Sequence, residues 1–289
     1  MGPLRRSGTM TANAGPRGLA KGLHRALLLV LAAAFLLPLL WMVAASLQPQ
    51  GKALEYGMFQ FPEGLHPENY PQALAQMGGF GRLLLNTTLL TLACIAGQLF
   101  CCSLAGYAFA RLRFPGRDGL FLLVLATMML PPQVLAIPQF LFFRQLGLID
   151  TFYPLILPTV LGGAPFFIFL FRQYFLTLPV ELAEAARVDG CGFFGTYFRI
   201  MLPLAKPVVG TVAIFTFLAT WNDFWAPLIY LNSEDKQTLS LALASFNQSY
   251  RVAVEWLMAG SSVILAPCAL VYFLTQGWFL RGVRLSGKG

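Results

Sequence analysis

The chain has 289 residues, of which 57% are hydrophobic and 11% are charged, and its formal net charge is +8. A soluble domain carries about 25% charged residues, so this composition excludes a single water-soluble core and predicts a membrane protein. The length suits one membrane domain of six spans better than two soluble domains.

The N-terminal part predicts a tail followed by a membrane span. Residues 1–22 are rich in Gly, Pro and basic residues, a composition typical of a disordered cytoplasmic tail. The first apolar run, Ala26–Ser46, follows closely. A basic lead before an apolar run also fits a secretory signal peptide, but the apolar core of such a peptide has only about 7–15 residues and this run is longer. We therefore expect an uncleaved first span.

The next three apolar runs are Leu83–Ala110, Leu120–Ile137 and Phe152–Phe171. The third contains Pro131-Pro132, which removes two backbone donors and must kink or unwind the helix. This indicates either a flexible, cavity-lining segment or the end of the helix at the interface. Prolines and a Gly-Gly pair interrupt the fourth run. Because irregular backbone at membrane depth persists only where protein or a water-filled cavity covers it, this run is a candidate pathway wall.

Two further apolar runs, Val208–Leu231 and Trp256–Phe279, complete six predicted spans. An even number of spans places both termini on one side of the membrane. Fifteen of the 20 Lys and Arg residues fall in the tails and loops on that side, which the positive-inside rule identifies as cytoplasmic. The basic excess therefore reflects topology and not nucleic-acid binding. We expect a multi-pass protein of the cytoplasmic (inner) membrane with both termini in the cytoplasm.

The polar stretch between the fourth and fifth runs predicts a short helix. Pro179 suits the first turn, and Thr177 is a candidate N-cap. Gly190 suits the left-handed position that ends a helix. Glu184 and Arg187 are spaced i, i+3 and can pair on one face. A second, slim face carries Leu182, Ala185, Ala186 and Asp189. Such a helix, on the order of 15 Å long, has the shape of an element that fits a groove in another protein.

The same stretch resembles the EAA loop of the permeases of ATP-binding-cassette importers. In that family the spacing is Glu-Ala-Ala, three residues, Gly, nine residues, Ile, one residue and Leu-Pro. This chain fills every one of those positions, with Glu184, Ala185, Ala186, Gly190, Ile200, Leu202 and Pro203. The stretch Thr220–Ile229 is also similar to the carbohydrate-type branch of these permeases, and the chain looks most like the second permease of maltose-type systems.

The resemblance covers residues 24–289 and implies an all-α membrane protein with six transmembrane helices. It implies a permease domain over residues 23–281, an EAA loop over residues 176–206 within it, and a cytoplasmic tail over residues 282–289. A cytoplasmic coupling helix would lie between the fourth and fifth spans, and the residues that engage an ATPase there would be Glu184, Ala185, Ala186, Asp189 and Gly190.

The resemblance also implies partners. These are a second homologous permease subunit, two ATPase subunits, an extracytoplasmic solute-binding protein and membrane lipid. The cargo would be a sugar or a related polyol, carried by alternating access. ATP and Mg²⁺ would bind to the ATPase subunits, so no cofactor is expected in this chain.

Asp223 is the only charged residue within the six apolar runs. A charge in a membrane helix costs about 2.5–3.5 kcal/mol at the bilayer centre, and less toward the edge. One interpretation is that Trp221, Asn222 and Asp223 face a solute pathway or its external gate. The other is that Trp221 and Trp225 form an interfacial aromatic belt while Asp223 reaches water. The sequence leaves both open.

Patterns for covalent chemistry are absent from the sequence. There is no G-x-x-x-x-G-K-[ST] loop for ATP, the two histidines (His24 and His66) lie apart, and the five cysteines lack CxxC spacing. We therefore expect a non-catalytic subunit without a metal site. A secondary, ion-coupled transporter is the main alternative, but it needs intramembrane ionisable residues and usually an internal repeat. A membrane scaffold that transports nothing would not require the Glu-Ala-Ala loop.

Overall fold

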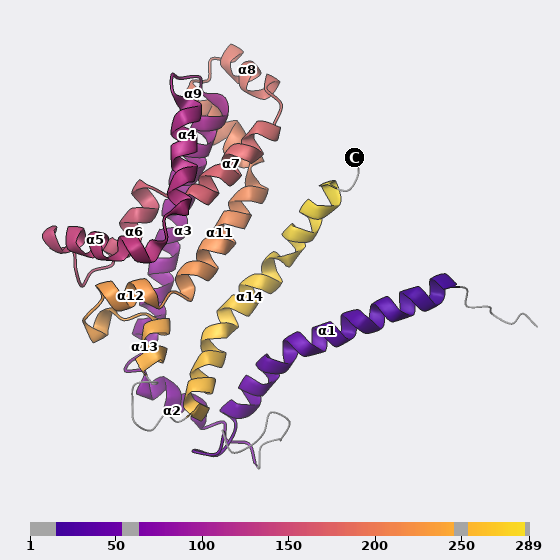
Figure 1. Cartoon of the computed structure of the whole chain (residues 1–289), viewed down its shortest axis with the longest axis vertical. Coiled ribbons are helices and arrows are strands. Elements are labelled where there is room, and N and C mark those ends of the chain that lie inside the picture. The colour runs from indigo at the N-terminus through magenta and orange to yellow at the C-terminus, as the bar shows by residue number, and fades with distance from the viewer. Residues whose placement is uncertain (1–15, 54–63, 246–253, 287–289) are drawn as a thin grey trace, which may run out of the picture.

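The computed structural model of the protein describes residues 16–53, 64–245 and 254–286, and every element in those ranges is a helix (Figure 1). The long helices are α1 (Pro16–Ser46), α3 (Phe80–Arg111), α11 (Lys206–Trp221) and α14 (Val254–Ser286). Those of intermediate length are α4 (Arg117–Ala126), α5 (Pro132–Gln145), α6 (Tyr153–Leu161) and α7 (Pro165–Thr177). The short helices are α2 (Asn69–Gln76), α8 (Glu181–Val188), α9 (Phe193–Thr196), α10 (Leu202–Leu204), α12 (Trp225–Tyr230) and α13 (Leu239–Ser245). These ranges also contain two short 3₁₀ helices, η1 (Thr127–Met129) and η3 (Glu234–Lys236), and one short π-helix, η2 (Tyr197–Met201).

Four helical stretches of the described chain are long and apolar enough to cross a membrane: Lys21–Ser46, Phe80–Arg111, Tyr153–Thr177 and Val254–Gln276. Two further pairs qualify only if each is counted as one span across a bend. These are Arg117–Met129 with Pro132–Gln145, bent by 99°, and Phe193–Leu204 with Lys206–Trp221, bent by 77°. The expected all-α membrane architecture is thus confirmed, with between four and six spans.

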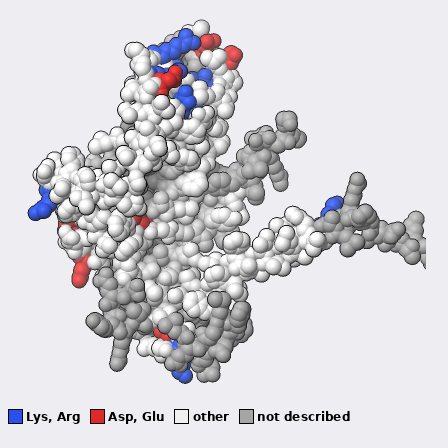
Figure 2. Space-filling model, in the orientation of Figure 1, with Lys and Arg blue, Asp and Glu red and all other residues white. Residues whose placement is uncertain are grey.

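The bundle has two distinct ends. We call them the α8 end, where α8 and α9 lie, and the α2 end, where α2 and α13 lie (Figure 1). On the face shown in Figure 2, Lys and Arg gather together with Asp and Glu at the α8 end, while the middle of the bundle is largely without charge. This distribution matches an apolar middle in lipid and polar ends in water.

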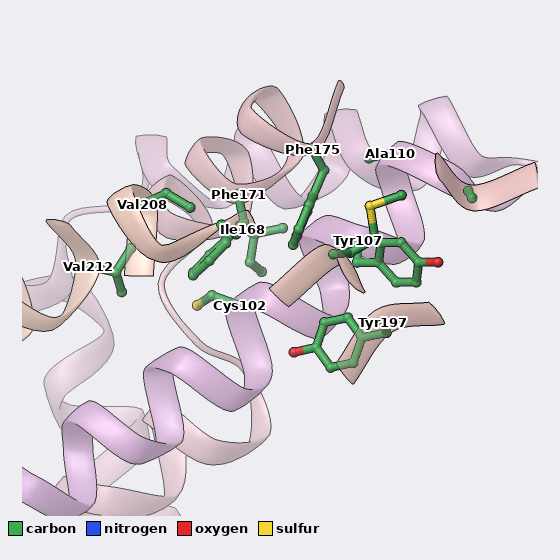
Figure 3. Close-up of a cluster of buried hydrophobic side chains, with 12 residues drawn as sticks. Cys102, Tyr107, Ala110, Ile168, Phe171, Phe175, Tyr197, Val208 and Val212 are labelled. Carbon is green, nitrogen blue, oxygen red and sulfur yellow. The ribbon is translucent and has the colours of Figure 1, made fainter. Parts of the chain in front are cut away.

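Helix α3 is the element around which α6, α7 and α11 pack. Its small residues permit close approach: a Cβ at Gly106 would lie 2.5 Å from Phe171 Cβ, and one at Gly97 would lie 2.6 Å from Thr159 Oγ1. Next to Gly106, Figure 3 shows the largest buried cluster, with side chains from α3, α7, η2 and α11. The labelled members are Cys102, Tyr107, Ala110, Ile168, Phe171, Phe175, Tyr197, Val208 and Val212.

The predicted interruption of the fourth run is confirmed at the junction between α6 and α7. Gly163 has a φ of +60°, and a Cβ there would lie 2.5 Å from Cys102 Sγ, so only glycine fits. Gln98 Oε1 of α3 accepts the freed N–H of Ala164 at 2.8 Å. Protein therefore covers the irregular backbone on this side, as an apolar medium requires.

The predicted break at Pro131-Pro132 is also confirmed. The η1 turn ends at Met129, α5 begins at Pro132, and the two parts of the run differ in direction by 99°. A proline at the first position of a helix costs no hydrogen bond, whereas a proline in the middle would. The prolines therefore start a new helix with a new direction.

The fifth predicted span, Val208–Leu231, is wrong as one continuous helix. Helix α11 ends at Trp221, and α12 begins only at Trp225. Between them, Asp223 Oδ1 accepts the backbone N–H groups of Trp225 at 3.0 Å and Ala226 at 3.3 Å. An Asp side chain that binds nearby N–H groups favours a turn over a continuing helix, which a count of apolar residues does not detect.

Other differences lie at the ends and in the loops. Helix α1 begins at Pro16, so residues 16–22 of the expected tail are helical, and residues 1–15 lie outside the described chain. Helix α14 runs to Ser286, past the expected end of the sixth span. Two short helices, α2 and α13, lie in loops for which no element was expected. Helices of seven or eight residues are too short to stand out by periodicity in a chain dominated by long apolar spans.

Helix α1 stands away from the bundle and is anchored at one end (Figure 1). None of its most apolar 18-residue window is buried. At the α2 end, Asn69 Nδ2 donates to the carbonyls of Ser46 at 2.9 Å and Gln48 at 2.8 Å. These bonds give partners to carbonyls that have none at the end of a helix. A buried polar junction therefore holds the end of α1, while its apolar residues do not pack against the bundle.

A second polar junction ties the loop before α6 to the loop after α12. The Asp150 carboxylate accepts the N–H groups of Asn232 and Ser233, each at 2.9 Å, and the Lys236 ammonium at 2.8 Å. These groups hold the pKa of Asp150 well below its usual range, chiefly through Lys236. Asp150 itself has a φ of 59°, the one left-handed conformation among the described non-glycine residues.

Asp150→Asn tests this junction, because Asn also tolerates a left-handed backbone but has no charge for Lys236. A lowered folded-state pKa gives stability that is present above the ordinary value of 3.8 and is lost as pH falls below it. We therefore expect a lower thermal midpoint than wild type throughout the neutral range, with the gap closing only in strong acid. Thermal unfolding in detergent over a pH series measures both.

The matched control is Asp235→Asn, which removes one exposed charge from the same loop. Its thermal midpoint should equal that of wild type. If the thermal midpoints of Asp150→Asn and wild type became equal near neutral pH, the assignment to Asp150 would be contradicted.

Gly106→Ala tests the close packing on α3. The added Cβ would meet Phe171 Cβ at 2.5 Å and the N of Arg172 at 3.0 Å, so overpacking should cost about 1–3 kcal/mol of unfolding free energy. A Cβ at Gly81, on the same helix, would have nothing within 4 Å, and Gly81→Ala should stabilise by about 0.4–1 kcal/mol. Thermal unfolding of both variants should show shifts of opposite sign. Equal shifts would mean that the contact with α7 does not limit residue 106.

Candidate functional site

The candidate site is the helix α8 and the residues that hold it. Helix α7 ends at Thr177, and α8 begins at Glu181. Leu178, between them, is extended with a ψ of 144°, the conformation favoured before a proline. The carbonyl of Val180 then accepts the N–H groups of Ala183 at 3.0 Å and Glu184 at 3.2 Å, which forms the first turn.

Thr177 is not the N-cap, so this prediction is wrong. Its hydroxyl donates to the carbonyl of Tyr174 at 2.7 Å, inside the last turn of α7. Leu178 is extended, and α8 begins at Glu181, two residues after the proline that was expected in its first turn.

The predicted C-terminal end at Gly190 is confirmed. Gly190 has a φ of +79°, and the N–H of Cys191 donates back to the carbonyl of Ala186 at 2.8 Å. The N–H of Asp189 donates to the carbonyl of Ala185 at 3.0 Å. The long bond across a left-handed glycine is the mark of a Schellman ending. Because a residue with a Cβ is strained at this φ, the end of α8 depends on glycine.

The inner face of α8 carries alanines. Ala183 and Ala186 are buried, at 6% and 2% exposed. Ala183 belongs to the same buried cluster as Tyr107 and Phe175. Ala186, which the sequence pattern placed on one outward face with Ala185, therefore turns inward, since residues three apart share a face. Small side chains let this short helix lie close against the bundle.

The outer face of α8 is exposed and mixes acidic with apolar groups. Glu184, Ala185, Asp189 and Gly190 are all exposed. Val188 is 87% exposed, a large value for an apolar side chain. The side chain of Arg187 lies outside the described residues, so the expected pair with Glu184 stays a prediction. Four of the five residues singled out in the motif are thus presented outward, and Ala186 is not.

The segment after Gly190 is fixed firmly to the bundle. Tyr197 and Met201 are buried in the cluster of Figure 3, and Tyr197 Oη lies 2.6 Å from Ser103 Oγ of α3. Leu202 packs against the same cluster, and Ala205 is fully buried at the bend before α11. The segment from Tyr197 to Ala205, which includes the motif residue Leu202, therefore attaches α8 to α11.

One residue at this site went unnoticed in the sequence. Arg111, the last residue of α3, donates from Nη2 to the carbonyls of Phe175 at 2.6 Å and Leu178 at 2.5 Å. In the sequence it is one of three arginines in a short basic loop and is explained by topology alone. Only the folded chain brings it to the connection between α7 and α8.

The second candidate group, Trp221, Asn222 and Asp223, lies where α11 ends. Trp221 is buried, and its Nε1 donates to the carbonyl of Ile264 in α14 at 3.1 Å. Asn222 is exposed, and its Nδ2 donates to the carbonyl of Leu218 at 2.8 Å. Asp223 is half-buried and binds the start of α12, as described above. The three side chains therefore have different hydrogen-bond partners, and of the three only Asn222 is exposed.

Metal ligation finds no support in the described part of the chain, where no group of three or more His, Cys, Asp and Glu side chains is placed to hold an ion. The described cysteines are all free thiols. The arrangement at α8 suits mechanical contact with another protein.

Comparison with known proteins bears on the identity of the chain. Residues 102–285 match the family described as "Binding-protein-dependent transport system inner membrane component". The arabinooligosaccharides transport system permease protein AraQ of Halalkalibacterium halodurans is 35% identical over 252 residues, which are 86% of this chain and 90% of that protein. The diacetylchitobiose uptake system permease protein NgcG of Streptomyces coelicolor is 31% identical over 256 residues, or 88% and 84%.

A solved structure shares the fold. It is the crystal structure of a bacterial ABC transporter involved in the import of the acidic polysaccharide alginate, and one of its chains aligns with a TM-score of 0.77 at 24% identity. The alignment covers 92% of this chain and 98% of that one. Taken with the family match over most of its length, this shows that the chain belongs to the inner membrane components of binding-protein-dependent transport systems and is a permease subunit.

Proposed function

We propose that this chain is one permease subunit of an ATP-driven sugar importer of the cytoplasmic membrane and that α8 is its coupling helix. In this proposal each bent pair counts as one span, which gives six spans. The α8 end faces the cytoplasm, because the loops and tails assigned to that side carry most of the Lys and Arg residues. The solute crosses by alternating access, in which binding energy shifts the bundle between two states.

The observation that carries the proposal is the outer face of α8. A helix capped at Gly190 presents Glu184, Ala185 and an 87% exposed Val188 at the polar end of an apolar bundle. Val180, just before this short helix, and Leu182, in its first turn, are exposed as well, and a group of exposed apolar side chains at a water-facing end favours a protein partner. The partner we propose is an ATPase subunit, which holds ATP and Mg²⁺ while this chain holds neither.

The exposed surface of α1 supports the proposal that a second permease subunit is present. The stretch Lys21–Ser46 of this helix has 26 residues and contains an 18-residue window with a mean hydropathy of 2.7, none of which is buried. Lipid covers part of such a surface in any membrane protein. A helix that also stands apart from its own bundle gives a homologous subunit room to pack between them, and two such chains would bind two ATPases.

The α2 end carries a loop that could contact a protein outside the membrane. The loop that follows α12 is held by Asp150 on one side and by Asn86 of α3 on the other, whose Nδ2 donates to the carbonyls of Asp235 and Gln237. A loop so fixed offers a rigid surface at the end opposite α8. We propose that the extracytoplasmic solute-binding protein docks there.

For the cargo we propose a sugar or a related polyol, and the arabinooligosaccharides and diacetylchitobiose named for AraQ and NgcG support a sugar. Asn222 is the exposed polar group at the broken end of α11 and would hydrogen-bond a hydroxyl of the solute. Trp221 and Asp223 would support it, the first through its bond to Ile264 and the second by holding α12.

Co-purification tests the proposal directly. A tagged chain expressed with its partners should bring down an ATPase and a second permease from detergent-solubilised membranes. Ala185→Trp adds bulk at the exposed centre of α8 and should lower the recovered ATPase about tenfold or more, the effect of losing one well-packed contact of about 1.4 kcal/mol. Quantitative blotting of both partners measures this.

The second permease is the internal control, because it would pack against the spans and not against α8. Its recovery should not change in Ala185→Trp. If the wild-type chain retains no ATPase, the proposed function is wrong. If Ala185→Trp retains as much ATPase as wild type, α8 is not the docking element.

The ending of α8 gives a further prediction. Gly190→Val places a β-branched residue at a φ of +79°, which should cost on the order of 1–2 kcal/mol and loosen the helix without removing the chain from the membrane. Solute-stimulated ATP hydrolysis of the assembled transporter should fall several-fold. Vesicle-reconstituted transporter with its binding protein provides the assay.

Gly192→Val is the matched control, since Gly192 has an ordinary φ of −70° and nothing within 4 Å of its Cβ position. This variant adds the same side chain two positions further on and should hydrolyse ATP like wild type. Equal losses in both variants would show that bulk, and not the left-handed ending, matters.

A further inference from the structure

We propose that Arg111 is the positioning residue that makes α8 and α3 move as one body. The inference rests on the proposed coupling role of α8. It adds a specific transmission contact to that role, on a residue outside the Glu-Ala-Ala motif.

The geometry of the contact is specific. Arg111 Nη2 carries two N–H groups, and it donates to two carbonyls, of Phe175 at 2.6 Å and of Leu178 at 2.5 Å. Leu178 is the residue that follows α7 and precedes Pro179. One guanidinium therefore binds the end of α7 and the start of the connection to α8 together.

The chain around α7 explains why this cation is needed. The last carbonyls of a helix lack the ordinary helical partner and carry partial negative charge. At the end of α7 the carbonyl of Phe175 accepts the N–H of Leu178 in a long bond of 3.3 Å. The last turn of α7 contains no basic residue, and Pro179 has no N–H to offer. Charge-assisted donors from Arg111 meet both needs, and such bonds are shorter and stronger than neutral ones.

A packing contact lies beside the hydrogen-bonded one. Tyr107, one turn before Arg111 on α3, belongs to the same buried cluster as Ala183 of α8. Tyr107 also meets the Phe175 ring edge-on, with ring centroids 5.6 Å apart. Arg111 thus holds the connection that leads into α8 to the last turn of α3, while Ala183 of α8 lies in the cluster that contains Tyr107. Restraint both before α8 and within it resists rotation as well as translation.

The other end of α3 is attached at the α2 end. Thr87 Oγ1 accepts the N–H of Leu239 at 2.9 Å, and Asn86 Nδ2 donates to the carbonyls of Asp235 and Gln237. A helix is stiff along its axis and rises 1.5 Å per residue. A displacement of α8 that Arg111 passes to α3 would therefore reach the loop after α12 at the opposite end.

Other bonds at the α8 end do not replace this one. Tyr174 Oη donates to the carbonyl of Leu204 at 3.0 Å, which joins α7 to α10. Arg172 Nε donates to the carbonyl of Phe109 at 3.4 Å, which joins the middle of α7 to α3. Within the described chain, Arg111 is the cation that reaches the carbonyl next to Pro179.

The experiment compares Arg111→Gln with Arg113→Gln in vesicles containing the ATPase, the second permease and the binding protein. Arg113 lies two residues away and is exposed, so its variant removes the same charge from the same loop. In Arg111→Gln, solute uptake per ATP hydrolysed should fall about tenfold or more, the effect of losing charge-assisted hydrogen bonds. Arg113→Gln should match wild type, and ATPase recovery should be unchanged in both.

Arg111→Lys should give an intermediate uptake per ATP, because Lys keeps the charge but lacks the planar fork. A merely structural role would lower the amount of assembled transporter and leave uptake per ATP unchanged. If Arg111→Gln couples uptake to hydrolysis as wild type does, or if Arg113→Gln is equally impaired, the inference is wrong. If wild type shows neither ATPase binding nor uptake, the proposed function is what fails.

A second measurement decides the matter should Arg111→Gln not assemble. Spin labels at Glu181, the first residue of α8, and at Arg113, both exposed, would be placed in a chain whose native cysteines are replaced. If α8 and α3 form one body, the distance between the labels stays constant between the nucleotide-free and ATP-bound transporter. A change in that distance would overturn the inference without any change at Arg111.

Discussion

The structure depends on one constraint: every backbone N–H or C=O group that a helix break leaves unpaired needs another hydrogen-bond partner. In an apolar medium an unpaired N–H or C=O costs several kcal/mol, yet this chain breaks its helices repeatedly. At three of these breaks a polar side chain supplies a missing partner: Gln98 between α6 and α7, Asp223 between α11 and α12, and Arg111 after α7. The breaks are therefore built features, and the side chains that cover them fix the direction in which each following helix leaves.

Two of these side chains lie on α3, which gives that helix its central place. Gly97 and Gly106 let α6 and α7 approach within contact of its backbone, while Gln98 and Arg111 bind the backbone at the two ends of α7. Close packing transmits displacement because interiors are dense and hardly compressible. A helix packed tightly along its length and bonded at both ends of its neighbour is suited to carry motion from one end of the bundle to the other.

The sequence predicts what depends on local pattern. Apolar runs mark the spans, Gly190 marks a left-handed ending, and Pro131-Pro132 marks a change of direction, because in each case the cause lies within a few residues of the effect. The side chains that bond to the backbone at these breaks could not be predicted. Gln98 meets Ala164, and Arg111 meets Leu178, only once the chain has folded. The same reason explains the inward turn of Ala186, which depends on where the bundle lies, and the end of α11 before Asn222, which a run of apolar residues hides.

The division of roles follows from where polarity is permitted. The motif residues that stay exposed lie at the α8 end, whereas inside the bundle the polar side chains of Gln98, Ser103 and Trp221 are occupied with backbone or with one another. A solute rich in hydroxyls needs accessible donors and acceptors, and the exposed Asn222, whose Nδ2 already bonds to the carbonyl of Leu218, offers few of them. Under the proposed function, the pathway is therefore completed by the facing subunit, and the side of this chain that α1 leaves uncovered is where that subunit would bring the remaining polar groups.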